Sequence, residues 1–138
     1  MAAIRRGRRD DLPRIAEIQE VSAEASHWRV EDYLGYGLWV AEESGTIAGF
    51  LVWREVGPEE GEILNLAVAP EWRRRGIARA LIQTFLGETS GVIFLELRES
   101  NLAGLNLYKS MGFQEVSRRA EYYDFPPEAA IVMKFHSC

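Results

Sequence analysis

Cysteine is nearly absent from this sequence, whose only thiol is that of Cys138, at the last position. A single cysteine cannot form a disulfide within the chain, and a terminal residue is rarely held in place, so we expect no disulfide framework and no cysteine nucleophile. Long apolar runs are also missing. No segment approaches the roughly 20 residues that cross a bilayer, and the residues after Met1 lack the apolar core of a signal peptide. These absences predict a cytoplasmic protein without membrane attachment.

Histidine is scarce as well, and negative charge outnumbers positive charge. The two histidines, His27 and His136, have no spacing typical of metal ligands, and they do not support a Ser-His-Asp arrangement. The sequence therefore predicts neither a metal site nor a serine nucleophile. Asp and Glu outnumber Lys and Arg by 21 to 16. This acidic surplus argues against direct nucleic-acid binding and is compatible with a basic partner.

The sequence does contain enough apolar surface for one core. With 138 residues, 47% of them hydrophobic, the chain has the length of a single domain, residues 1–138. The expected strands are 3–6, 37–42, 46–56, 62–69, 92–97, 113–116 and 130–135, and the expected helices are 12–23, 30–36, 77–86 and 102–111. The turn Glu43-Ser44-Gly45 predicts an antiparallel hairpin, and 121–127 is expected to be a loop. Three consecutive strands followed by alternating helices and strands indicate a mixed α/β sheet.

An arginine-rich segment opens the helix expected at 77–86. Arg73 to Arg75 and Arg79 lie around its first turn, although each cation beside the positive end of a helix dipole is unfavourable by about 0.3–1 kcal/mol. Free backbone N–H groups, a glycine at Gly76 and several guanidiniums together suit a pyrophosphate or nucleotide phosphate. A solvated basic turn explains the same residues equally well.

One carboxylate, Glu96, interrupts the apolar strand at 92–97. Strand alternation puts it on the face of Val92 and Phe94, where partial desolvation would raise its pKa toward that of a general base. The residues alone favour a simpler interpretation, in which a glutamate at a strand end reaches water.

Tyr108 and Asn101 are also ambiguous when considered alone. Leu105 and Tyr108 are spaced as i, i+3 on a helix, which is ordinarily a core arrangement, and Phe113 can pack on Tyr108 across a turn at Gly112. Asn101 fits the N-cap of the same helix.

Several segments together resemble the GCN5-related N-acetyltransferases, the GNAT superfamily. The run Arg73 to Ala78 is similar to the Gln/Arg-x-x-Gly-x-Gly/Ala signature of that family, and it follows a strand as the signature should. The segments 95–101 and 107–113 most closely resemble the RimI-type ribosomal-protein-alanine N-acetyltransferases, and the likeness continues at 118–119, 122–123 and 130–133. Two residues depart from the pattern: Ala78 replaces the last glycine, which the family allows, and Ala129 stands where the RimI branch usually has an acidic residue.

The resemblance implies a GNAT fold, a mixed and largely antiparallel sheet with helices on both faces and with central strands that splay to admit acetyl-CoA. Backbone groups of a strand would hold the pantetheine arm, the arginine-rich segment would hold the pyrophosphate, and an asparagine would contact the coenzyme. The residues implied for binding acetyl-CoA are Leu66, Ala67, Val68, Arg74, Arg75, Gly76, Ile77, Ala78, Arg79 and Asn101.

The resemblance also implies the chemistry. Glu96 matches the general base, acting directly or through a water, and Tyr108 matches the general acid that protonates the departing thiolate of coenzyme A. A phenol with a pKa of about 10 can protonate a thiolate whose thiol has a pKa of about 8.5 at only modest cost. The acceptor implied is a primary amine, the N-terminal alanine α-amine of a ribosomal protein in the RimI branch. A lysine or small-molecule amine stays open because the motifs describe the donor side, and a CoA-binding module without chemistry would predict loss of Glu96 and Tyr108.

An aromatic segment after the first helix is where members of this family commonly bind the acceptor. Trp28 and Tyr33 belong to this segment, and simple packing explains them equally well. Acidic residues around the segment would suit a basic tail, although an ordinary solvated surface also accounts for them. These residues are Glu17, Glu20, Glu24, Glu31 and Asp32.

Overall fold

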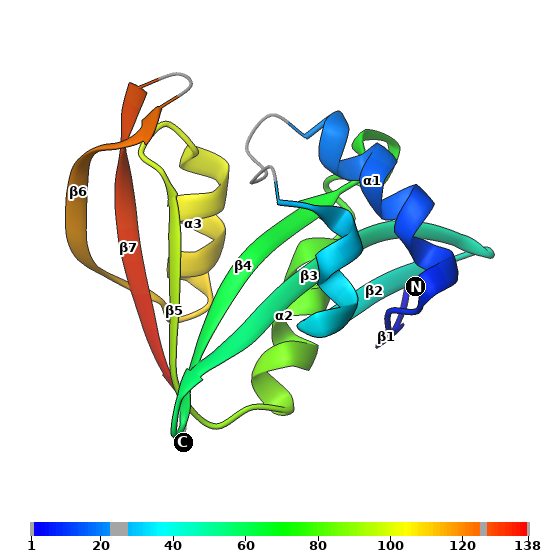
Figure 1. The fold of residues 1–138 in the computed structure, drawn as a ribbon, viewed down its shortest axis with the longest axis horizontal. Coiled ribbons are helices and arrows are strands. Elements are labelled where there is room, and N and C mark those ends of the chain that lie inside the picture. The colour runs from blue at the N-terminus through cyan, green and yellow to red at the C-terminus, as the bar shows by residue number, and fades with distance from the viewer. Residues whose placement is uncertain (1, 23–27, 125–126, 138) are drawn as a thin grey trace. The chain divides into compact units, whose positions relative to one another are not determined.

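The computed structural model describes residues 2–22, 28–124 and 127–137, and its elements follow the order expected from the sequence (Figure 1). The strands are β1 (Ala3–Arg6), β2 (Gly37–Glu43), β3 (Thr46–Gly57), β4 (Glu60–Val68), β5 (Gly91–Arg98), β6 (Gln114–Asp124) and β7 (Pro127–Ser137). The α-helices are α1 (Leu12–Glu20), α2 (Ile77–Gly87) and α3 (Leu102–Ser110), and the 3-10 helices are η1 (Arg9–Asp11), η2 (Val30–Gly35) and η3 (Pro70–Trp72).

The strands are hydrogen-bonded in the order β1-β2-β3-β4-β5-β7-β6. β1 with β2, β2 with β3, β5 with β7 and β6 with β7 pair antiparallel, whereas β4 and β5 pair in parallel from Glu60 and Val92 to Ile63 and Leu95. This pattern confirms the expected mixed, largely antiparallel sheet with flanking helices. The splaying of the central strands stays a prediction.

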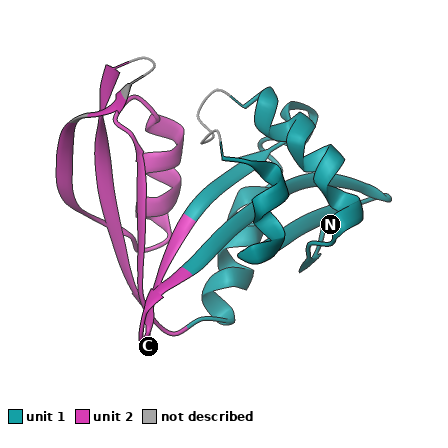
Figure 2. Cartoon of the chain, in the orientation of Figure 1, with its two compact units in different colours: residues 1–54, 64–89 teal, residues 55–63, 90–138 magenta. Residues whose placement is uncertain are grey.

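The chain divides into two compact units (Figure 2). Unit 1 comprises residues 1–54 and 64–89, and unit 2 comprises residues 55–63 and 90–138. β3 and β4 therefore contribute residues to both units. The expectation of a single domain over residues 1–138 stays a prediction.

Unit 1 carries helices on both faces of its strands (Figure 1). Phe50 of β3 lies in a buried apolar cluster with Ile18 of α1 and Tyr33 of η2. Trp53, three residues along the same strand, projects to the opposite face and packs against Phe85 of α2, with ring centroids 5.1 Å apart. The period-2 alternation of β3 therefore lets one strand serve two apolar layers.

Unit 2 packs α3 against one face of its strands. Ile93, Leu95 and Leu97 of β5 are buried, and Phe135, the register partner of Ile93, contacts the ring of Phe113 at a centroid distance of 5.1 Å. Phe113 in turn contacts Tyr108 of α3. Strand alternation places the even-numbered residues of β5 on the opposite face, away from α3.

Two expected boundaries are wrong. The first helix ends at Glu20 rather than near residue 23, because the chain leaves helical geometry at Val21 (φ −93°, ψ 6°) and the Ser22 N–H bonds to the Gln19 carbonyl, three residues back, at 3.2 Å. The expected loop at 121–127 is mostly strand, since β6 continues to Asp124 and β7 begins at Pro127. β6 is an edge strand whose described residues are mostly exposed, so it shows no apolar alternation, and its pairing with β7 defines it instead.

Two smaller differences concern the helices. Gly87, expected to stop the helix that begins at Ile77, is its last residue, and the helix expected at 30–36 is a 3-10 helix. The expectations for Glu24, His27 and Cys138 lie outside the described residues. No helix in the described part of the chain is long and apolar enough to cross a bilayer.

Candidate active site

The second half of β4 carries the residues predicted to hold pantetheine. Close packing against β3 depends on Gly49, where an added Cβ would lie 2.9 Å from the Ala67 carbonyl oxygen. Two backbone groups of this stretch are engaged by side chains: the Leu66 N–H donates to Asn65 Oδ1 at 3.0 Å, and Arg73 Nε donates to the Val68 carbonyl at 3.0 Å. The Leu66 N–H and the Val68 carbonyl are thus each held by a side chain that is close in the sequence.

The loop that enters α2 contains two residues with left-handed backbone angles. Arg74 and Gly76 both have left-handed backbone angles, with φ of 64° and 78°. Alternation of left-handed with other conformations turns successive N–H groups toward one concave side, and the first N–H groups of α2 have no partner within the helix. This geometry supports the predicted phosphate cradle at residues 74–79.

The side chains around this loop agree with an anion site on the surface. Arg73, Arg74, Arg75 and Arg79 are all exposed. The Arg75 guanidinium lies over the Trp72 ring, 5.0 Å from its centroid. At Gly76, an added Cβ would meet no atom of the described residues within 4 Å, so the space beside this glycine is open. Ile77 is buried and begins the helix, whereas Ala78 is half-buried.

Glu96 lies on the face of β5 opposite α3, as strand alternation predicted. Its side chain is 21% exposed, and its Oε1 accepts a hydrogen bond from Arg119 Nη1 at 3.0 Å. An interaction with Glu96 is the main cause that raises the pKa of Tyr122 above its usual range. The surroundings of Glu96 are therefore less apolar than Val92 and Phe94 indicated.

Arg119 and Tyr122 are site candidates that the sequence reasoning missed. They lie 23 and 26 residues beyond Glu96. The pairing of β6 with β5 through β7 brings Arg119 to the face of Glu96, and Tyr122 reaches the same group through its interaction with Glu96. The Arg119 guanidinium also lies 5.1 Å from the Tyr122 ring centroid. The Arg118-Arg119 and Tyr122-Tyr123 pairs of the family resemblance were the signal that could have found them.

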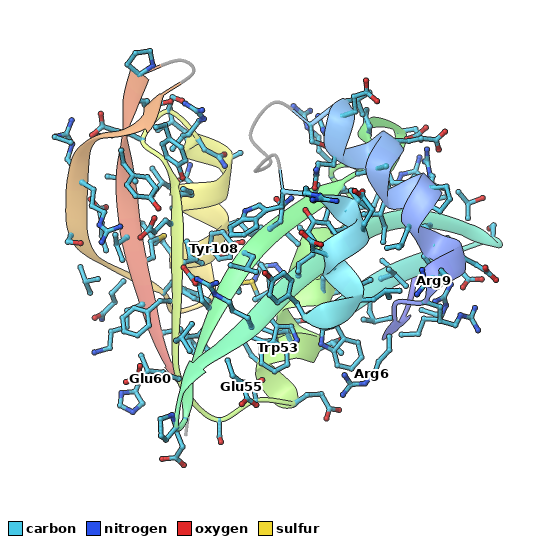
Figure 3. All side chains as sticks on the ribbon, viewed as in Figure 1. Arg6, Arg9, Trp53, Glu55, Glu60 and Tyr108 are labelled. Carbon is cyan, nitrogen blue, oxygen red and sulfur yellow. The ribbon has the colours of Figure 1, made fainter. Side chains whose placement is uncertain are left out.

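Tyr108 is buried at the end of α3, with 7% of its surface exposed (Figure 3). Its ring packs edge-on against Phe113 with centroids 5.2 Å apart, so the packing role favoured by the residues alone is present. Burial raises the pKa of Tyr108 well above its ordinary value of 10. The phenol is therefore protonated at neutral pH, which is the state required of a general acid.

Asn101 is the N-cap of α3. Its Oδ1 accepts the N–H of Gly104 at 2.9 Å, which confirms the capping role. The contact with coenzyme implied by the resemblance stays a prediction.

The two aromatic residues expected near the acceptor have different positions. Tyr33 is fully buried against Phe50, whereas Trp28 is 38% exposed. Glu17 and Glu31 are exposed and ion-paired with neighbouring arginines at 3.5 Å, as a solvated surface requires. Within the described ranges, no three His, Cys, Asp or Glu side chains are grouped so that they could hold a metal ion.

Comparison with known proteins supports a single family. Residues 2–113 match the family described as the acetyltransferase (GNAT) family. The chain is 33% identical over 137 residues to the ribosomal protein bS18-alanine N-acetyltransferase of Escherichia coli (strain K12), with 89% of each chain covered. It is 33% identical over 129 residues to the N-alpha-acetyltransferase RimI of Mycobacterium tuberculosis, with 91% of this chain and 75% of that protein covered.

The fold leads to the same group of proteins. The crystal structure of the ribosomal-protein-S18-alanine N-acetyltransferase from Escherichia coli superposes with a TM-score of 0.85 and 28% identity, and the match covers 99% of this chain and 94% of that chain. These likenesses confirm both the resemblance found in the sequence and the expected fold.

Proposed function

The chain belongs to the GNAT family of acetyltransferases, and from that premise we propose that it acetylates the N-terminal α-amine of a protein, specifically the alanine terminus of a small-subunit ribosomal protein. The protein is an N-acetyltransferase that takes its acetyl group from acetyl-CoA. The observation that carries the proposed acceptor is the 33% identity, over 89% of both chains, to an enzyme named for the alanine of bS18. Such an acceptor places the reaction in the cytoplasm.

On the donor side, Leu66 to Val68 hold the pantetheine arm and the segment from Arg74 to Arg79 holds the pyrophosphate. Asn101 adds a contact to the coenzyme. The left-handed angles of Arg74 and Gly76, the open space beside Gly76 and the exposed arginines support this assignment, because a pyrophosphate needs N–H donors, close approach and positive charge.

The chemistry is assigned to Glu96 and Tyr108. Glu96 takes a proton from the acceptor amine, directly or through one water, as the amine nitrogen bonds to the thioester carbonyl carbon. The carbon–sulfur bond breaks, and Tyr108 gives its proton to the leaving thiolate. Burial raises the pKa of the Tyr108 phenol and keeps it protonated, which supports its role as the acid.

An α-amine demands less of a base than a lysine does. At a pKa of about 8, roughly a tenth of an α-amine is neutral at pH 7, whereas a lysine amine with a pKa of about 10.4 is neutral in well under about one part in a thousand. The described residues 28–36, here the acceptor segment, border the incoming peptide in this proposal. The exposed acidic residues around it suit the basic tail of a ribosomal protein.

A competition assay tests the acceptor. The protein is incubated with acetyl-CoA and three acceptors: a basic peptide that begins with alanine, the same peptide with its N-terminus blocked but with a lysine present, and a panel of small amines. Mass spectrometry locates the acetyl group, and a Glu96→Gln variant controls for non-enzymatic acetylation. We expect the highest kcat/KM for the free alanine terminus. A higher value for the blocked peptide or a small amine would overturn the α-amine proposal and leave the family assignment intact.

A further inference from the structure

Three buried polar side chains of unit 1 form a cluster that the proposed chemistry does not use. Gln19, Tyr33 and Asn65 are 8%, 0% and 6% exposed, and they come from α1, η2 and β4. Asn65 Nδ2 donates to Gln19 Oε1 at 3.0 Å and to the Tyr33 hydroxyl at 3.1 Å. The Tyr33 hydroxyl in turn donates to Gln19 Oε1. Each side chain therefore contacts both of the others.

The cluster ends on the backbone at two places with proposed functions. Gln19 Nε2 donates to the Trp28 carbonyl at 2.7 Å, at the start of the acceptor segment. Asn65 Oδ1 accepts the N–H of Leu66 at 3.0 Å, at the start of the residues assigned to pantetheine. A chain of hydrogen bonds between side chains thus connects Trp28 with Leu66.

The surroundings make this arrangement specific. Tyr33 lies in the apolar cluster of Ile18 and Phe50, where an unpaired polar group would be strongly unfavourable. A different relative placement of α1, η2 and β4 would therefore break hydrogen bonds of the cluster and leave a buried donor or acceptor unpaired. Burial also raises the pKa of Tyr33 to about 12, which keeps its hydroxyl protonated as the donor to Gln19.

We propose that Gln19, Tyr33 and Asn65 are positioning residues that fix the acceptor segment relative to the donor strand at Leu66. This inference rests on the proposed function, which gives the segment and the strand their acceptor and donor roles. Position matters because a misplacement of about 1 Å between reacting groups can lower the rate about 100-fold. The three side chains contact neither substrate in this account, and they act through the backbone at Trp28 and Leu66.

Tyr33→Phe is the most selective test, since it removes one hydroxyl and keeps the ring, which packs 5.9 Å from the Phe50 ring. The hydroxyl loses its bonds to Gln19 and Asn65, whereas the Asn65 bond to Leu66 remains. We expect the acceptor KM to rise about 3- to 10-fold, in line with the loss of one net hydrogen bond. The Kd of acetyl-CoA, measured by calorimetry, should stay within about twofold.

Asn65→Ala should behave differently because it removes the end of the cluster at Leu66 together with the bonds to Gln19 and Tyr33. We expect both the acceptor KM and the Kd of acetyl-CoA to rise, and the double variant with Tyr33→Phe should raise the acceptor KM by less than the product of the single effects. If Asn65→Ala does not fold, the split between acceptor KM and acetyl-CoA Kd in Tyr33→Phe decides the question.

Ile18→Val is the matched control. Ile18 precedes Gln19 on α1 and lies in the same apolar cluster as Tyr33. The substitution removes one methylene and no hydrogen-bonding group. This variant should lower the Tm and leave the acceptor KM and the acetyl-CoA Kd unchanged. The proposal is overturned if Tyr33→Phe has kinetics like Ile18→Val, or if it weakens acetyl-CoA binding as much as acceptor binding.

The assay also separates this inference from the proposed function. The variants are measured with whichever amine the wild-type protein prefers. If that amine is a lysine or a small molecule, the proposed acceptor fails, while the ratio of acceptor KM to acetyl-CoA Kd still tests the cluster. If the α-amine peptide is preferred and the ratio does not change in Tyr33→Phe, only the positioning role fails.

Discussion

Replacing Gly76 by alanine tests the phosphate cradle, because its effect on the free protein follows from the structure. Gly76 has a φ of 78°, and an added Cβ would meet no atom of the described residues within 4 Å. The change therefore introduces backbone strain without a clash, about 1–2 kcal/mol for an L-residue in the left-handed region. If the loop relieves this strain by rotating, its N–H groups turn away from the anion.

The expected loss of binding can be estimated from those N–H groups. A hydrogen bond to a charged group contributes about 1.5–3 kcal/mol, so one lost bond to the pyrophosphate should raise the Kd of acetyl-CoA about 10- to 150-fold. Calorimetry of acetyl-CoA measures this directly. S-acetylpantetheine, which lacks the pyrophosphate, should bind equally well to the wild-type and variant proteins. Gly76→Val should have a larger effect because a β-branched residue fits the left-handed region less well.

Gly45 supplies a matched control elsewhere in the chain. It also has a φ of 78° and open space around its added Cβ, but it lies in the turn between β2 and β3. Gly45→Ala should lower the unfolding free energy by a similar amount and leave the Kd of acetyl-CoA unchanged. Unchanged affinity in a folded Gly76→Ala protein, or an equal loss in Gly45→Ala, would refute the assignment of the cradle to this loop.

Three further predictions concern titratable groups. Glu96→Gln should lower kcat about 10²–10⁴-fold while acetyl-CoA binding is retained; a near-wild-type rate would rule out the base. Tyr108→Phe should lower kcat, and because burial raises the pKa of Tyr108 above 10, the wild-type profile should show no basic limb from this phenol below that pH; a limb near pH 8 that disappears in the variant would contradict this reasoning. Tyr33 has a pKa of about 12 when folded and about 10 when unfolded, so its contribution to stability is complete below pH 10 and is lost as the pH rises to 12. Urea unfolding of the wild type should show about 2–3 kcal/mol more alkaline loss than Tyr33→Phe, and identical slopes would contradict the burial of that hydroxyl.

The sequence by itself determined the elements whose cause is local. The turn at Glu43-Ser44-Gly45 joins two antiparallel strands, and positive φ values at Ser44 and Gly45 supply the twist that a tight hairpin needs. The helix after Gly76 and the cap at Asn101 also depend on residues within one turn of each other. The strand–loop–helix signature therefore identified both the family and the candidate phosphate cradle.

Only the tertiary structure decided which distant side chains meet. Glu96 is paired with Arg119 because β7 lies between β5 and β6 in the sheet. The edge strand that carries Arg119 has no apolar alternation from which its length could be predicted. Asn65 meets Gln19 across 46 residues, in a core where the sequence near each residue predicts only a strand or a helix. Local periodicity specifies which face of an element is buried, whereas the identity of a hydrogen-bond partner depends on the register between elements, which forms only when the elements pack together.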